Sequence, residues 1–342
     1  MGAGDRLEVL IRRCYAGLDA DQVRAEVLAR LPGVLTVDAA FFATVDPATV
    51  LFTSAYADEP LRAATEQFLT NEFGQDDVNK FAVLAGGPEP VRSLGQATRG
   101  EWASSPRYVE VMRPLGLGDE LRAALLSNGR CWGVLCLHRE DADSGFSDSE
   151  IQLVRRLAPH LAEALRRALR THPAEPDSVA RVGPGVVVLD EAFRVESVTA
   201  EAEYWLEEIG AVGELPVAVR AVAARRHVDG QTARLKVKTR RGEWLELQAS
   251  ELGEHGRTAV VIEPVPAAEL GSLLLELHGL TPAQRRVTEL LLRGYSTRQI
   301  VERLCLSPHT VQEHVRASYD KVGVGSRREL VSVLLRGSAS RG

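Results

Sequence analysis

The chain has 342 residues and a formal net charge of −6, from 41 basic and 47 acidic side chains. The length predicts two or three domains, at roughly 150 residues each, and the content of 45% hydrophobic and 26% charged residues excludes a mainly disordered chain. No apolar run reaches the roughly 18 residues of a membrane helix, and charges near the N-terminus argue against a secretory signal. Four cysteines are too few for a disulfide scaffold, so we expect a cytoplasmic protein that contacts no membrane.

Two polar, proline-containing stretches interrupt the hydrophobic patterns, at 171–178 and 263–272. Such stretches are typical of linkers. They divide the chain into three predicted domains, which are 1–170, 178–263 and 272–342. The patterns within them predict an α+β protein, with two antiparallel-sheet domains followed by an all-α domain.

The first segment alternates between helical and strand patterns. Apolar residues at helical spacing predict an N-terminal helix, and a second helix over 21–31 follows Asp19 and Asp21, which are suitable N-cap residues. Asp46 and Pro47 mark a turn between two strands, a helix is expected over 60–71, and Asn128 with Gly129 predicts a hairpin turn. The predicted strands are 36–45, 49–57, 121–126 and 131–138.

A long helix is predicted over 148–169. Its apolar residues recur at steps of three and four, a short heptad seam suited to pairing with another helix, so it is a candidate dimer surface. Pro159 lies inside the run, where we expect a kink or a break. The seam consists of Ile151, Val154, Ala158, Leu161 and Leu165.

Helices, antiparallel strands and a closing amphipathic helix, in this order, resemble a GAF-type sensor domain over about 150 residues. The second segment has an apolar strand at 186–190, a strand at 194–198 and a helix at 200–209, which resemble the opening of a PAS domain. Three more strands are expected, but the stretch 215–227 is short for a PAS domain, so we interpret the segment as PAS-like and truncated. These resemblances imply a region that senses a small-molecule effector or a partner.

The third segment carries the most specific pattern. Thr281 with Gln284, and Ser296 with Gln299, have the spacing of capping boxes at two helix starts. Ser307 precedes a proline at a third start. Apolar residues at helical spacing follow each start, and with an apolar helix over 326–335 they predict a compact four-helix unit.

This unit resembles the C-terminal helix-turn-helix DNA-binding domain of LuxR-type regulators over about 57 residues. The family usually has Glu where this chain has Gln284, which keeps a capping role. It usually has Lys where this chain has Gln312, so a neutral side chain replaces a positively charged one among the expected base-contacting residues. The resemblance implies a homodimer on two half-sites of double-stranded DNA, with 326–335 as fourth core helix and dimer contact. The matching residues are Leu280, Thr281, Gly294, Ile300, Leu304, Ser307, Thr310, Val311, His314, Lys321, Gly323, Val324 and Arg328.

The charge of this segment supports a DNA partner despite the acidic total. Residues 280–336 contain ten basic and five acidic side chains, a net charge of +5, which leaves −11 on the rest of the chain. Phosphate binding depends on the local field more than on the total charge.

The second helix of such a motif lies in the major groove, with its N-terminal residues at the base edges. Opposite its expected core valines lie Gln312, Glu313 and Arg316, the residues to which the resemblance points for base contact. Gln suits adenine, Glu can accept from cytosine, and Arg suits guanine. Glu313 could instead lie on a solvated face, and His314 is expected to pack within the unit. The expected phosphate contacts are Ser307, Thr310 and Lys321.

The cysteines and histidines of the sensor region suggest no cofactor. Cys131 and Cys136 are five apart and should face opposite sides of one strand, which suits neither a shared metal nor a disulfide. Cys14 and Cys305 lie on apolar helical faces and are expected in the core. Cys136 and His138 could ligate haem or a metal, but we favour packing, so no metal and no cofactor are expected.

No catalytic constellation stands out, and we expect no enzyme. Asn79-Lys80 and Asp119-Glu120 match part of a cyclic-nucleotide pattern of some GAF domains, but Leu115 replaces its Phe, so nucleotide binding is not expected. The chain also lacks a receiver-like acidic pair and a phosphate-binding loop. We therefore expect a ligand-responsive transcription regulator; the alternatives are a sensor region that only dimerises or binds a protein, and a signalling enzyme with a DNA-binding tail.

Overall fold

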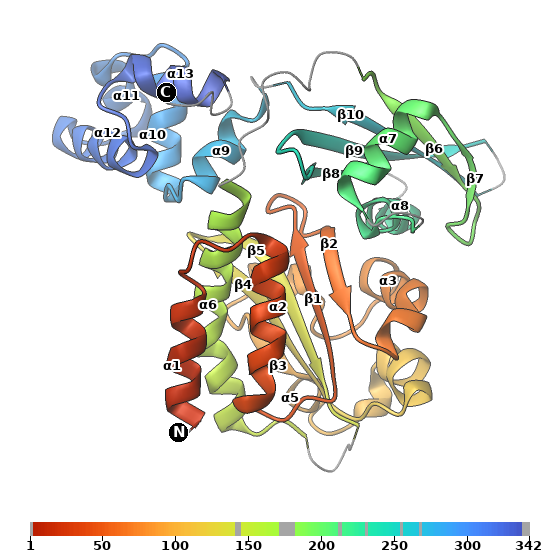
Figure 1. Cartoon of the computed structure of the whole chain (residues 1–342). Helices are drawn as coiled ribbons and strands as arrows, with labels where there is room; N and C mark the ends of the chain where they lie inside the picture. Colours follow the sequence, from red (N-terminus) through yellow and green to blue (C-terminus); the bar gives the residue numbers. More distant parts are fainter. Residues whose placement is uncertain are drawn as a thin grey trace.

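The computed structural model describes residues 3–140, 145–170, 182–210, 214–229, 232–253, 256–266 and 269–336. Figure 1 shows a first sheet with its helices, a second sheet beside it, and a helical unit that contains the C-terminus. The linker predicted at 171–178 lies outside the described residues. None of the described helices has the length and hydrophobicity needed to span a bilayer.

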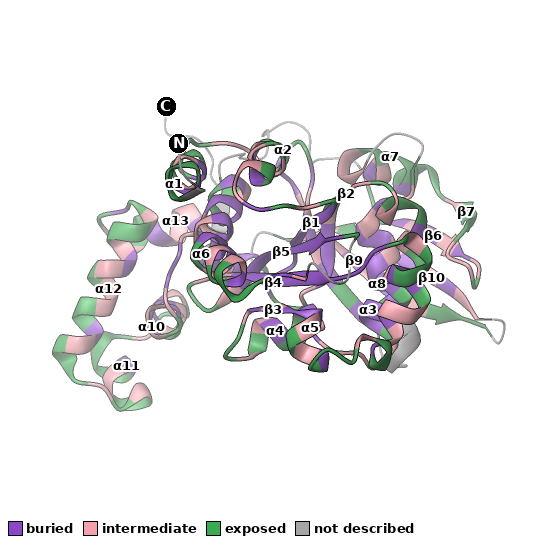
Figure 2. Ribbon diagram, turned by 90° about the horizontal axis from the view of Figure 1, so that it is seen from below, coloured by how far each residue is buried: buried purple, intermediate pink, exposed green. Residues whose placement is uncertain are grey.

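Five antiparallel strands form the first sheet, in the order β2-β1-β5-β4-β3. Every residue of β1 is buried, because α1, α2 and α6 pack on the face that carries Phe42 and Leu135, and α3 and α4 pack on the face that carries Phe41 and Val134. Figure 2 shows these buried strands between the helices. The strands are β1 (Ala39–Val45), β2 (Phe52–Ala57), β3 (Val91–Ser93), β4 (Glu120–Ser127) and β5 (Arg130–His138). The helices are α1 (Ala3–Arg13), α2 (Ala20–Arg30), α3 (Thr65–Gly74), α4 (Phe81–Gly86), α5 (Leu94–Thr98) and α6 (Asp148–Arg170), with single turns at η1 (Leu31–Gly33), η2 (Leu61–Ala64), η3 (Trp102–Ser104), η4 (Tyr108–Met112) and η5 (Arg113–Leu115).

The predicted starts and turns of this part are confirmed. Asp19 is the N-cap of α2 in a capping box with Gln22, and Asp21 lies in the first turn. Asn128 and Gly129 have φ values of 52° and 72°, the conformation of the hairpin turn expected from Asn-Gly.

One expectation about the cysteines is wrong. The β4–β5 pairing shifts register between Leu125 and Leu126, a bulge that adds one residue on β5. Cys131 and Cys136 therefore belong to the same hydrophobic cluster, while Trp132 lies in the cluster on the opposite face. Side chains normally alternate between the two faces of a strand, but the extra residue of the bulge interrupts this alternation, so the prediction from sequence spacing is wrong here.

The structure also corrects the interpretation of α6. Its seam residues are all buried within this chain, against β4, β5, α1 and α2, so the seam is not a free dimer surface. The helix continues through Pro159 without a break. Residues on both sides of the proline, Val154 and Leu161 among them, are held on the same sheet, and this packing offsets the lost backbone hydrogen bond.

The second sheet has the order β7-β6-β10-β9-β8, so its strands are arranged in the same order as those of the first sheet. This segment was predicted to be a truncated PAS-like domain. All five strands are present, and the segment is short only in the connection between α7 and β8, where α8 is the one described helix. Helix α8 packs against α3 and β2, so one hydrophobic cluster extends across both sheets. The elements are β6 (Gly185–Leu189), β7 (Val195–Val198), α7 (Ala200–Ile209), α8 (Val217–Asp229), β8 (Ala233–Lys238), β9 (Trp244–Leu252) and β10 (Arg257–Pro264).

The C-terminal unit contains the four predicted helices and an additional short one, α9. Thr281 with Gln284 and Ser296 with Gln299 form capping boxes, as predicted. Cys305 is exposed in a left-handed conformation at the end of α11, so its expected core position is wrong: the helix ends before its apolar face would include this residue. The helices are α9 (Gly271–Leu277), α10 (Pro282–Leu292), α11 (Thr297–Leu304), α12 (Pro308–Val322) and α13 (Arg327–Arg336).

Candidate nucleic-acid interface and sensor cavity

Helices α11 and α12 form a helix-turn-helix. The hydroxyl of Ser296 accepts the backbone N–H of Gln299 at the start of α11, and that of Ser307 accepts the N–H of Thr310 at the start of α12. Val311 is fully buried in the core of the unit. The caps therefore define where each helix begins, and Val311 defines which side of α12 faces outward.

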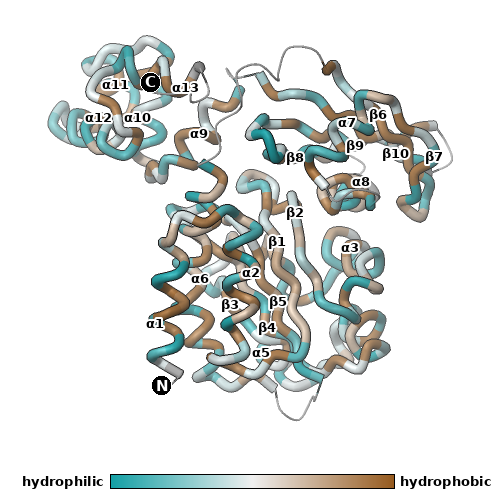
Figure 3. The backbone as a smooth tube through the Cα atoms, in the orientation of Figure 1, coloured by the Kyte–Doolittle hydropathy of each residue, from teal (hydrophilic) through white to brown (hydrophobic). Residues whose placement is uncertain are grey.

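The outward face of α12 carries the three predicted base-contacting residues. Gln312, Glu313 and Arg316 are all exposed, and Figure 3 shows a largely hydrophilic α12. Glu313 Oε1 lies 3.4 Å from Nε2 of His309 one turn earlier. Among the described residues Arg316 has no ion pair, so its guanidinium is available to a partner.

The three predicted phosphate-contacting residues lie in two places. At the N-terminus of α12 the hydroxyls of Ser307 and Thr310 are 2.9 Å apart, beside the backbone N–H groups that favour anions. Lys321 lies near the other end, where its Nζ donates to Gly279 O at 2.8 Å and to Gln284 Oε1 at 2.9 Å. An ammonium has three donors, so one remains for a phosphate.

The α3 side of the first sheet contains a small cavity. Its volume is about 30 Å³, which is room for one water molecule. Phe41, Phe68 and Met112 are among its apolar lining residues, and the second sheet's side contributes Val217 from the start of α8. Its polar lining residues are Thr65, Arg107, Glu120 and His138.

A buried charge network borders this cavity. Glu120 Oε2 lies 2.7 Å from Arg107 Nη2, and Glu120 Oε1 lies 3.0 Å from Arg122 Nε. Arg122 also pairs with Glu72 at 2.6 Å. Burial alone would raise the pKa of Glu120, but the two guanidiniums hold that pKa well below its usual range.

Burial lowers the pKa of His138 in the same network to about 4. Sequence reasoning missed this network. Glu120 and Arg122 are two positions apart on one strand and Arg107 lies 13 positions before Glu120, so no local pattern indicated that the two arginines share a partner.

The residues of the partial cyclic-nucleotide pattern serve the fold instead. Asn79 Nδ2 donates to Ser93 O, and Lys80 Nζ donates to the carbonyl oxygens of Asn71 and Glu72. Asp119 accepts backbone N–H groups of Gly95, Glu120 and Phe146. The side chains that could recognise a nucleotide are thus occupied by internal hydrogen bonds.

Helix α9 joins the sensor region to the helix-turn-helix unit. Leu270, Leu273 and Leu277 belong to the core of the first sheet and α6, whereas Leu275 belongs to the core of the C-terminal unit. The predicted boundary at 272 therefore falls inside a helix that both cores share. Helix α9 is short and its apolar residues face two different cores, so its sequence could not be distinguished from that of a linker.

Charged side chains reinforce this joint. Glu276 on α9 accepts from Arg130 Nε, at the end of the β4–β5 hairpin, at 2.9 Å, and it also pairs with Arg285 on α10. Arg166 on α6 donates to the carbonyl oxygen of Leu277. One carboxylate thus links an arginine of the sensor region to an arginine of the helix-turn-helix unit.

Comparisons with known proteins match both parts of the chain. The sequence model of the bacterial regulatory proteins, luxR family, matches residues 278–334, and that of the GAF domain matches 19–165. Spore germination protein GerE of Bacillus subtilis is 39% identical over 57 residues, which are 17% of this chain and 77% of GerE. A Mycobacterium tuberculosis protein described as an HTH-type transcriptional regulator is 45% identical over 62 residues, 18% of this chain; this chain spans only 7% of that relative. Among solved structures, Escherichia coli SdiA aligns over 98% of both chains with 12% identity and a TM-score of 0.36.

Proposed function

Because this chain belongs to the luxR family of bacterial regulatory proteins, we propose that it is a cytoplasmic, DNA-binding transcription regulator in which the sensor region controls α12. The observation that carries the proposal is the exposed polar face of α12, set by Ser307 at its start and by buried Val311. The helix lies in the major groove of double-stranded DNA. Gln312, Glu313 and Arg316 read base edges, and Ser307, Thr310 and Lys321 contact phosphates.

The regulator acts as a homodimer on two half-sites, as helix-turn-helix proteins do when their operators are palindromic. Leu330 and Leu334 of α13 are buried in the core of their own unit. The dimer contact therefore uses the outer side of α13, which includes half-buried Val331, or another surface of the chain.

The β4–β5 hairpin is the proposed route from the sensor cavity to the DNA-binding unit. Glu120 and His138 at its open end line the cavity, and Arg130 beside its turn pairs with Glu276 at the joint. A ligand or partner that shifts this hairpin changes the contact on α9. The scaffold alternative, in which the sensor region binds only protein, is favoured by the size of this cavity, which at about 30 Å³ must enlarge to hold a metabolite; an open pocket of about 660 Å³ between α2 and β2 would need no such enlargement.

Selection of bound sequences from random oligonucleotides at low salt tests the DNA-binding proposal. We expect one enriched half-site motif, and Arg316→Ala should relax one base position, since a good Arg–guanine pair discriminates by about 1–3 kcal/mol. Arg298→Ala is the matched control, because this exposed arginine of α11 carries the same charge away from α12. It should weaken binding to all sequences alike. An unchanged motif with Arg316→Ala would exclude the groove assignment, and no enrichment for the intact chain would exclude DNA reading altogether.

A thermal-shift screen of the full chain against metabolites separates the two sensor hypotheses. A ligand that binds the folded state raises the melting temperature, and a hit that requires Phe68 and Met112 of the cavity wall would support ligand sensing. No hit with DNA binding intact would support the scaffold.

A further inference from the structure

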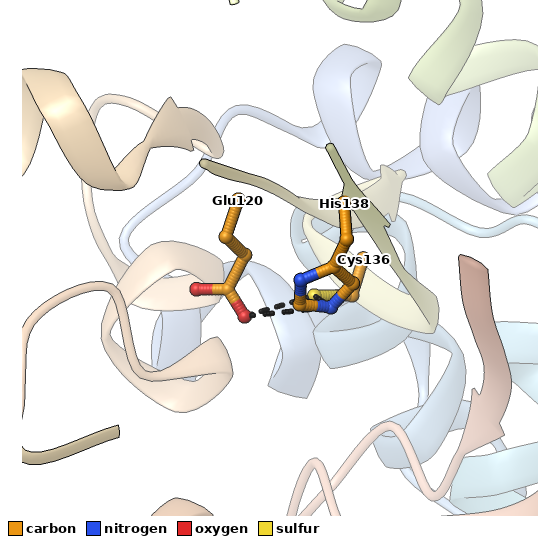
Figure 4. A group of neighbouring side chains, drawn as sticks. All are labelled: Glu120, Cys136 and His138. Atoms are coloured by element: carbon orange, nitrogen blue, oxygen red, sulfur yellow. Dashed lines mark hydrogen bonds and ion pairs between the residues drawn. The ribbon is translucent and has the colours of Figure 1, made fainter. Parts of the chain in front are cut away.

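We propose that Glu120, Cys136 and His138 form a binding site for one divalent transition-metal ion of the zinc type. Figure 4 shows the three side chains, from the neighbouring strands β4 and β5, directed toward a common point. All three residues are buried. The proposal concerns the sensor region and does not depend on whether α12 binds DNA.

The distances between the donor atoms fit a single ion. Cys136 Sγ lies 3.0 Å from Glu120 Oε1 and 3.2 Å from His138 Nε2, and the nitrogen and the oxygen are 3.9 Å apart. Three atoms with these separations lie on a circle of radius about 2.0 Å, so one ion can approach all three at the roughly 2.0–2.3 Å of Zn²⁺ bonds to nitrogen, oxygen and sulfur.

The chemistry of the donor set indicates the class of metal. A thiolate, an imidazole and a carboxylate together suit zinc, cobalt or iron, and they are a poor set for magnesium or calcium, which prefer oxygen ligands alone. Binding releases the thiol proton of Cys136 to solvent, because the thiolate is the metal ligand.

The cavity supplies the fourth position. It is bordered by Glu120 and His138 and has room for one water molecule. Metal sites that bind an exogenous ligand keep such an open position beside three protein ligands.

The surrounding charges tolerate the ion. Three carboxylates face two guanidiniums in the buried network, and the ammonium of half-buried Lys80 lies at its edge. The five buried charged groups sum to −1, and a divalent ion bound to a thiolate adds one positive charge, so the buried groups and the ion together are neutral; the half-buried ammonium of Lys80 leaves one positive charge at the edge. The five buried charged residues are Glu72, Asp77, Arg107, Glu120 and Arg122.

Cobalt(II) titration of the full chain, after removal of bound metal with a chelator, tests the site. We expect one equivalent to bind, with a near-ultraviolet thiolate-to-cobalt charge-transfer band, and the melting temperature to rise with cobalt concentration. Zn²⁺ should displace the cobalt and abolish the band. A wild-type chain without this band, or with no rise in melting temperature, would overturn the proposal.

Two cysteine variants assign the band. Cys136→Ala should abolish it, whereas Cys131→Ala should retain it, because Cys131 is a buried thiol on the same strand and in the same hydrophobic cluster but bonds to Gly133 O instead. His138→Gln should weaken cobalt affinity by at least tenfold and shift the visible bands. Near-ultraviolet circular dichroism checks that each variant is folded. A band that persists in folded Cys136→Ala, or that disappears in Cys131→Ala, would refute the assignment.

Discussion

Replacing Glu276 by glutamine tests how the sensor region holds the DNA-binding unit. Glu276 is 6% exposed and bonds to both Arg130 and Arg285. Glutamine keeps the shape and removes the charge, so the buried guanidinium of Arg285 loses its counter-charge. Its Nε already lacks a hydrogen-bond partner among the described residues, and the nearby charge of Glu289 is what remains to offset the guanidinium.

The expected magnitude follows from the burial of the two pairs. Breaking a buried ion pair by removing one partner costs about 3–5 kcal/mol, and the retained amide hydrogen bond places Glu276→Gln near the lower end. Arg130→Gln is the matched control, because the Arg130 side chain is 38% exposed and an exposed pair contributes about 0.2–1 kcal/mol. The two variants interrupt the same contact with unequal cost.

Native-state hydrogen exchange of the α9 amides is the assay, since it reports the free energy of local opening. A cost of about 3 kcal/mol corresponds to roughly 100-fold faster exchange in Glu276→Gln, against less than about fivefold in Arg130→Gln. Equal, small changes in both variants would refute the reasoning. The joint would then be held mainly by Leu270, Leu273 and Leu277, together with the hydrogen bond from Arg166 to Leu277 O.

Three further predictions concern the same joint and the unit beyond it. Lys321→Ala should weaken binding to all DNA sequences alike and, through the lost bonds to Gly279 and Gln284, lower stability by about 1–2 kcal/mol in denaturant titration; a change in the base preference would contradict this. Burial and the neighbouring Arg170 lower the pKa of His278 to about 4. The stability that the neutral imidazole contributes is therefore fully present above 6.5, the pKa of histidine in the unfolded chain, and it is lost as the pH falls toward 4. At pH 5 the lost stability is at most about 2 kcal/mol. Urea melts at pH 7 and pH 5 should show that His278→Gln loses less stability on acidification than the wild type; an equal loss in both proteins would exclude His278 as the cause. A fragment of residues 272–342, which lacks the acidic sensor region, should bind random DNA more tightly than the full chain in low-salt titrations; equal affinity would mean that the sensor's charge does not oppose binding.

The local signals of this chain were strong where short-range chemistry decides the structure. The capping boxes at Thr281 and Ser296 and the Asn128-Gly129 turn were predicted correctly because each involves residues within a few positions of one another. The exposed face of α12 followed from helical spacing once its start at Ser307 was known.

Patterns that depend on distant partners were less informative. The heptad seam of α6 was interpreted as a surface for a second helix, but its partner is the chain's own sheet. The alternation that separated Cys131 from Cys136 failed at a bulge that depends on the pairing of β5 with β4. Arg107, Glu120 and Arg122 showed no common pattern, because their association depends on burial beneath α3 and the η4 turn.

The sequence by itself determined the helix-turn-helix, its capped starts, the residues on the outer side of α12 and the separation of a basic end from an acidic remainder. Each of these depends on spacing along the chain, which the order of residues specifies directly. Only the tertiary structure decided that α9 is shared by two cores, that Glu276 links Arg130 to Arg285, and that Glu120, Cys136 and His138 converge beside a cavity. Apart from Cys136 and His138, which are two positions apart on one strand, these contacts join residues 9 to 146 positions apart. Bringing such residues together costs chain entropy that only the folded packing of both sheets offsets.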